Sequence, residues 1–124
     1  MARELRVLVE WETVLHRMLD CSTRFPKSVR YSFVHRIDNL VLDITQHIVQ
    51  AQYAPQEEQL YHLSILNSKV AQLRLLWRIS ADRGYLSMGQ LRDIIASLEG
   101  IGYQVHAWVQ QGKHEEEPKT EGML

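Results

Sequence analysis

An apolar seam recurs with the same spacing in four successive segments of the chain. In the second and fourth segments it comprises Val34, Ile37, Val41, Ile44, Ile48 and Ala51, and Leu91, Ile94, Leu98, Ile101, Val105 and Trp108. Steps of three and four residues place such side chains on one face of an α-helix. A helix with an apolar stripe must bury it against neighbours, and short connections make those neighbours antiparallel. The pattern therefore predicts an all-α fold, an antiparallel up-down four-helix bundle.

Proline marks the boundary between the first two predicted helices. The first is expected over residues 2–20, with a seam of Val7, Trp11, Val14 and Met18. It must end before Pro26, because proline has no amide hydrogen and disfavours helical geometry at the preceding residue. Ser28 can act as the N-cap of the second helix, which is expected to run to about Gln52.

A second proline and a glycine delimit the other two predicted helices. The third is expected over residues 56–83, after Pro55, a residue that a first helical turn tolerates. Gly84 suits the position after a helix C-terminus, and Ser87 can cap the fourth helix, expected over residues 87–111.

Some apolar and glycine positions are not required for the core of a single four-helix bundle. Leu75 and Ile79 broaden the apolar arc of the third helix, which indicates a second buried face. Gly100 and Gly102 each cost about 1 kcal/mol relative to alanine inside a helix, and they would let another backbone come close. Both features indicate contacts between subunits.

Composition fits one folded domain followed by a polar segment. The chain has 124 residues, 45% of them hydrophobic, which is enough for one core. Residues 112–124 hold four glutamates against two lysines and are expected to form a disordered acidic tail after a bundle over residues 1–111. The formal net charge of −1 leaves the bundle at about +1, so any basic binding site must be local.

Cysteine usage and hydropathy bear on the compartment. The single Cys21 excludes an internal disulfide, and no apolar run reaches the roughly 20 residues of a membrane span. The first residues mix acid and base in a helical pattern, which is unlike a signal peptide. A cytoplasmic location without membrane contact is expected.

The histidines do not form a known metal motif. Three pairs stand four residues apart, on one helix face each: Glu12 with His16, Asp43 with His47, and Glu58 with His62. The Glu-x-x-His motif of di-iron bundles is absent from the sequence. We interpret the pairs as ordinary surface or interface contacts and expect no metal.

Catalytic motifs are also missing from the sequence. It contains no Gly-rich phosphate loop and no Gly-x-Ser-x-Gly elbow, so neither an enzymatic activity nor a cofactor is expected. Cys21 and His16 could be imagined as nucleophile and base, but a small apolar residue at a helix end is the favoured interpretation of Cys21.

Two local clusters of cations form the candidate site. No acid interrupts the first between residues 24 and 37, and aromatic residues are interleaved with it. The clusters comprise Arg24, Lys27, Arg30 and Arg36, and Lys69, Arg74, Arg78 and Arg83. Phosphate binding favours cations in an array, to which arginine adds forked hydrogen bonds and stacking. The alternative is that these side chains only solvate the bundle or pair with glutamates across helices.

The residues around Pro26 carry a family resemblance. The stretch Arg24-Phe25-Pro26-Lys27-Ser28-Val29-Arg30-Tyr31 resembles the Phe-Pro-Lys-Ser-x-Arg-Phe/Tyr signature of the four-helix-bundle accessory variability determinants of diversity-generating retroelements. Relatives of that group are encoded in intervening sequences of bacterial 23S ribosomal RNA genes. The resemblance covers roughly residues 5–110 and includes, in order, Leu42-Asp43-Ile44, Ala51-Gln52-Tyr53, Leu73-Arg74-Leu75-Leu76-Trp77-Arg78-Ile79, Leu86-Ser87, Glu99-Gly100-Ile101-Gly102 and Trp108.

This resemblance implies a non-catalytic accessory protein. Members of the family resemble a barrel of five bundles with a positively charged surface. They associate with the reverse transcriptase of the retroelement and bind RNA, and possibly DNA, during mutagenic copying of template RNA into cDNA. By position, the residues expected to contact phosphate or an acidic polymerase surface are Arg24, Lys27, Arg30, Arg74 and Arg78.

Two other functions stay open. One is an intervening-sequence type of bundle with an RNA-directed role, and the other is a structural oligomerisation module that binds only protein. A neighbouring reverse-transcriptase gene with template and variable repeats would favour the retroelement role. Salt-dependent RNA binding would exclude the protein-only module, because released counterions are the signature of phosphate contact.

Overall fold

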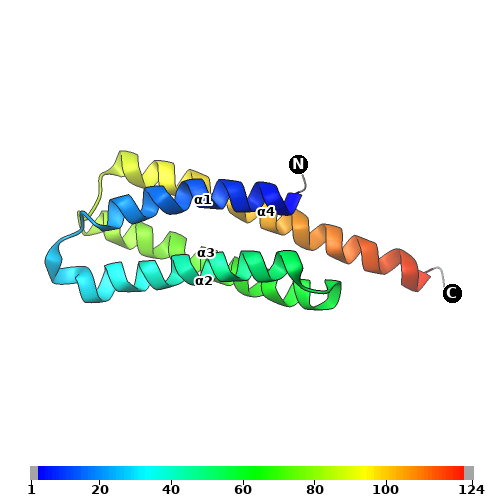
Figure 1. The fold of residues 1–124 in the computed structure, drawn as a ribbon. Helices are drawn as coiled ribbons and strands as arrows, with labels where there is room; N and C mark the ends of the chain where they lie inside the picture. The colour runs from blue at the N-terminus through cyan, green and yellow to red at the C-terminus, as the bar shows by residue number, and fades with distance from the viewer. Residues whose placement is uncertain (1–2, 122–124) are drawn as a thin grey trace.

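A computed structural model describes residues 3–121 of the chain, and within that range it contains helices and no strand. The four long helices are α1 (Arg3–Ser22), α2 (His35–Tyr53), α3 (Gln56–Asp82) and α4 (Met88–Glu121). The helices alternate in direction, and α1 contacts α2, α2 contacts α3, α3 contacts α4 and α4 contacts α1 (Figure 1). The predicted all-α class is therefore confirmed. None of the described helices is both long and apolar enough to cross a membrane.

The predicted seams form the core of the bundle. Trp11, Trp77 and Trp108 are the largest of its fully buried side chains. Trp11 donates a hydrogen bond from Nε1 to the Thr45 hydroxyl over 2.8 Å, which satisfies the indole and ties α1 to α2. Every seam residue named from the sequence is buried except Val34 and Leu91, which are half-buried at the starts of their segments. Hydrophobic periodicity thus located the core correctly.

The connection from α1 to α2 differs from the prediction. Ser28 does not cap α2. After Pro26 the chain forms a 3₁₀ turn (Lys27–Val29) and then a π-helical turn (Arg30–Val34) before α2 begins at His35. The reason is Phe25, a buried residue whose ring contacts Trp77 at a centroid distance of 5.7 Å. The chain must cross the end of the bundle to bury this ring before it can enter α2.

The predicted ends of α3 and α4 are confirmed at the turn between them. Gly84 has a φ of 81°, the left-handed conformation that glycine adopts readily. Its N–H donates to the Ala81 carbonyl and the Tyr85 N–H donates to the Ser80 carbonyl, both over 2.9 Å, which is the Schellman pattern. Ser87 then caps α4: the Gln90 N–H donates to the Ser87 hydroxyl and the Ser87 N–H donates to the Gln90 side chain.

The predicted end of the fourth helix at Gln111 was wrong, because α4 continues to Glu121. Gly112 is buried, and its carbonyl accepts a hydrogen bond from the Gln56 side chain over 3.3 Å. Glutamine, lysine and glutamate favour helix, and extending a formed helix costs little. The division into a bundle and a separate acidic tail stays a prediction, and residues 122–124 lie outside the described residues.

The surplus apolar and glycine positions are only partly covered by the described protomer, because Ile79, Gly100 and Gly102 are half-buried. A side chain at Gly100 or Gly102 would meet no atom within 4 Å, so no backbone of the described protomer approaches these glycines. Leu75 is 57% exposed. The predicted close approach therefore does not occur within the protomer.

Candidate nucleic-acid interface

The fold gathers four of the predicted cations at one end of the bundle. This end holds both the α1–α2 connection and the α3–α4 turn (Figure 1). Phe25 and Phe33 of the connection pack on Tyr85 of the turn, with ring centroids 5.4 Å apart in each case. We call the cations carried by these two segments the bundle-end cations: Arg24, Lys27, Arg30 and Arg83.

The bundle-end cations are exposed and carry unpaired charge. Within the described part of the chain, none of them forms an ion pair with a carboxylate. Arg83 donates a hydrogen bond from Nε to the Tyr85 hydroxyl over 3.0 Å, and this contact raises the pKa of its guanidinium further. The hydrogen bond fixes the direction of the side chain while its charge stays available.

One side of the bundle end has mixed charge. A hollow of about 270 Å³ between α1 and α4 is lined by Arg17 and Arg24, but also by the carboxylates of Asp20 and Asp93. Lys27 and Arg30 do not line this hollow, and no acid occurs between residues 24 and 37. Lys27 and Arg30 therefore lie apart from the two carboxylates of this hollow.

The interleaved aromatic residues do not all serve the same purpose. Phe25 is buried and Phe33 is half-buried, so these rings hold the connection in place and cannot stack on a ligand. Tyr31 is 86% exposed. It is the aromatic side chain of this segment that could contact a nucleobase.

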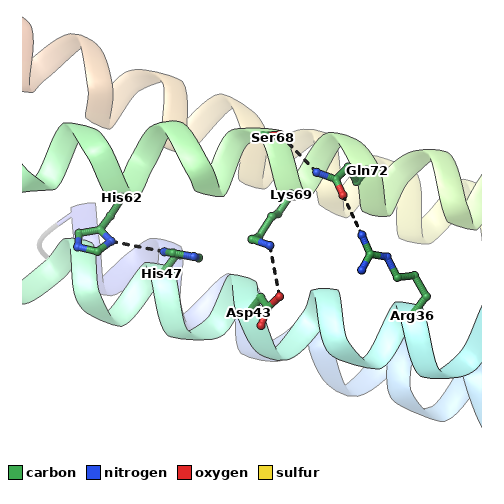
Figure 2. Close-up of polar contacts among 7 residues, drawn as sticks. All are labelled: Arg36, Asp43, His47, His62, Ser68, Lys69 and Gln72. Carbon is green, nitrogen blue, oxygen red and sulfur yellow. Dashed lines mark hydrogen bonds and ion pairs between the residues drawn. The ribbon is translucent and has the colours of Figure 1, made fainter.

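Two other predicted cations lie along the seam between α2 and α3 (Figure 2). Lys69 forms an ion pair with Asp43, with 3.3 Å between Nζ and Oδ2. Arg36 donates to the side-chain oxygen of Gln72 over 3.5 Å. We call this row of contacts the α2–α3 seam. Lys69 thus pairs with a carboxylate across two helices, as in the alternative left open by the sequence, although the partner is an aspartate. Arg36 is exposed and has a neutral partner, so its charge is not paired with a carboxylate among the described residues.

A pair of histidines completes the α2–α3 seam. His47 and His62 face each other with 3.4 Å between their Nδ1 atoms (Figure 2). Burial lowers the pKa of His47, the charges of His62 and Lys69 lower it further, and Asp43 acts in the opposite direction. Two neutral rings can share one N–H···N hydrogen bond, whereas two protonated rings would repel each other. The sequence placed each histidine beside an acid and missed their contact across the helices.

The remaining cations, Arg74 and Arg78, lie on α3. Arg78 is exposed, whereas Arg74 is half-buried and lines a hollow of about 570 Å³ between α3 and α4. We call it the α3–α4 hollow; its other lining residues are Asn67, Glu99, Gly102, Tyr103 and His106. Sequence periodicity gave no signal for this hollow, because its residues come from two helices and lie outside the apolar stripes of α3 and α4.

Within the described residues, potential metal ligands are not clustered and the one cysteine is buried. No group of three or more histidine, cysteine, aspartate or glutamate side chains is placed to hold a metal ion within residues that the structure describes. Cys21 is buried, and burial raises the pKa of its thiol more than the nearby Arg24 lowers it. Such a thiol is a poor nucleophile.

Comparison with known proteins supports the resemblance seen around Pro26. A family model described as bAvd-like matches residues 6–112, a span that begins in α1 and ends in α4. No curated protein matches the chain. The match covers all four helices and both segments that carry the bundle-end cations.

Proposed function

The chain belongs to the bAvd-like family, and on that premise we propose that it is a non-catalytic accessory factor of a diversity-generating retroelement. It binds the reverse transcriptase of that element and its template RNA or cDNA, in the cytoplasm, and so supports mutagenic reverse transcription. The family match supports the accessory role, and the bundle end supports the binding role.

One observation carries the binding role: the bundle-end cations project from one end of a rigid helical frame without carboxylate partners among the described residues. Arg83 is also held by its hydrogen bond to Tyr85, so it loses little conformational entropy when it binds a polyanion. Arginine can also grip phosphate through two parallel hydrogen bonds. The same array could contact an acidic surface of the polymerase.

Assembly into a homo-oligomer, expected to be a pentamer, is part of the proposal. Leu42, Val49 and Tyr53 share one face of α2 at steps of seven and four residues, and all three are exposed. Exposed apolar faces of this kind are typical of surfaces that another protein covers. A ring would repeat the bundle-end cations around its axis and produce a continuous basic surface.

The test compares two double charge reversals that change net charge equally. Lys27→Glu with Arg30→Glu alters the bundle end, whereas Arg6→Glu with Lys113→Glu alters exposed cations near the other end. Binding of template RNA is measured by fluorescence anisotropy over a range of salt concentrations, and capture of the reverse transcriptase by pull-down. Light scattering gives the mass of each variant in solution.

We expect the bundle-end variant to lose at least about tenfold in RNA affinity. Its salt slope should fall by about 1.4, since each single-strand phosphate contact contributes about 0.7. It should also capture less polymerase, while the Arg6 and Lys113 variant stays close to wild type. Equal losses in both variants would show that only net charge matters. Wild-type protein that binds neither RNA nor polymerase would contradict the proposal.

A further inference from the structure

We propose that the α3–α4 hollow binds one unpaired nucleotide of the RNA, with its base stacked on Tyr103 and its phosphate on Arg74. We also infer that Glu99 makes guanine the preferred base. This inference rests on the proposed RNA-binding function and adds a second contact, away from the bundle-end cations.

The size and floor of the hollow suit a nucleotide. Its volume of about 570 Å³ lies within the range of about 300–1,000 Å³ that is usual for small-molecule sites. Gly102 contributes no side chain, and a Cβ there would meet nothing within 4 Å. The space beside Tyr103 is therefore open to a flat ring.

Tyr103 is available as a stacking platform. Its side chain is 78% exposed and makes no ring contact with the described residues. A large exposed ring gains free energy when a base covers it, and base–aromatic stacking contributes about 1–3 kcal/mol per base. Stacking is open to every base, so it does not by itself select a sequence.

Arg74 supplies the charge for the phosphate. It is half-buried, yet within the described part of the chain it forms neither a hydrogen bond nor an ion pair. Glu99 lines the same hollow but forms no ion pair with Arg74. Because Arg74 is half-buried, water screens its charge less than in bulk, and it attracts an anion more strongly. A nucleotide phosphate fits this requirement.

Glu99 supplies the selectivity. A carboxylate accepts two hydrogen bonds side by side, and the Watson–Crick edge of guanine offers two adjacent N–H donors. Uracil presents a single N–H between two carbonyl oxygens, which a carboxylate would repel. An acidic peptide of the polymerase could also pair with Arg74, but its carboxylate would leave the Tyr103 ring uncovered. The exposed ring beside the guanidinium thus favours a nucleotide over an acidic peptide.

Two labelled RNAs test the inference: a ten-nucleotide uridine oligomer, and the same oligomer with one central guanosine. Anisotropy gives the affinity of wild type and of the Tyr103→Leu, Tyr103→Phe and Glu99→Gln variants for each. Tyr61→Leu is the matched control, because Tyr61 is 65% exposed on α3, outside the hollow and outside the proposed oligomer face. Light scattering reports the mass in solution.

We expect wild type to prefer the guanosine probe, and Tyr103→Leu to lose at least about fivefold in affinity, the low end of base stacking. Tyr103→Phe and Tyr61→Leu should bind like wild type. Glu99→Gln should reduce the preference for guanosine while retaining affinity for the uridine oligomer.

Each contrary result has a distinct meaning. If wild type binds neither probe, this inference is overturned, whereas the proposed function fails only if template RNA and polymerase are not bound either. If wild type binds RNA but Tyr103→Leu and Tyr61→Leu behave alike, only this inference is overturned. It is also overturned if Tyr103→Leu changes the mass in solution, or loses polymerase capture with RNA affinity intact, because the hollow would then be a protein contact.

Discussion

The bundle end and the α2–α3 seam contain the same kinds of cation in different surroundings. Lys69 lies 3.3 Å from an Asp43 oxygen, and Arg36 donates to Gln72. Lys27 and Arg30 have no carboxylate partner within the part of the chain that the structure describes. A basic residue on a helical bundle can either pair with a neighbouring helix or remain free to bind a polyanion. Only the residues around it in the folded structure decide which of these occurs.

The largest effect on stability should come from the buried Phe25 side chain at the bundle end. Phe25→Ala removes a buried side chain that contacts Trp77 and Tyr85 and holds the basic connection in place. We expect the free energy of unfolding to fall by about 3–5 kcal/mol, measured by chemical denaturation. Tyr31→Ala, in the same segment but 86% exposed, is the control and should change it by less than about 0.5 kcal/mol. Similar losses would mean that Phe25 does not anchor the connection.

Single neutralisations sharpen the comparison of the two regions. Arg30→Gln should reduce the salt slope of RNA binding by about 0.7, because one phosphate contact is lost. Lys69→Gln should leave the salt slope unchanged, since Lys69 is already paired with Asp43 and makes no phosphate contact. Anisotropy titrations at several salt concentrations measure both. A larger effect of Lys69→Gln would reverse the assignment of the two regions.

A double-mutant cycle measures what the seam contributes to stability. Lys69→Ala, Asp43→Ala and the double variant should give a coupling free energy of about 0.2–1 kcal/mol, the range of exposed ion pairs. The value should shrink at high salt, because counterions screen partly exposed charges. Thermal or urea unfolding at low and high salt provides the measurement. A coupling of zero at low salt would show that the pair does not stabilise the contact between α2 and α3.

The smallest effect should be a pH dependence of stability from the histidine pair. The folded protein lowers the pKa of His47 below its ordinary value of 6.5, so the unfolded chain binds the proton more readily. The contribution of the neutral His47 ring to the free energy of unfolding is complete above pH 6.5. It is lost as the pH falls through the lowered pKa that His47 has in the folded protein. His47→Gln should flatten this part of the stability–pH curve, with exposed His16→Gln as the control. Urea unfolding between about pH 5 and 8 would reveal it, and an unchanged curve for His47→Gln would contradict it.

Most of the fold could be predicted because burial follows helical period. The seams, the Gly84 terminus and the Ser87 cap all depend on residues close in sequence, which interact through local backbone geometry. The start of α2 could not be predicted, because the burial of Phe25 against Trp77 joins residues far apart in the chain. The predicted end of α4 at Gln111 was too early, because an acidic, polar composition is typical of disordered segments, whereas α4 continues to Glu121.

The candidate site was also predictable only in part. The sequence supplied all eight cations, and its resemblance around Pro26 identified the family that residues 6–112 match. It could not show that Lys69 pairs with Asp43, that His47 meets His62, or that Arg74 and Tyr103 share a hollow.

Helical period and capping operate over a few residues, so the four amphipathic helices, the α3–α4 turn and the set of basic residues follow from the amino-acid sequence. Which of those charges are paired and which are free depends on how the helices pack. Electrostatic contacts depend on distance in space, and that distance is set only when helices from separate parts of the chain pack together.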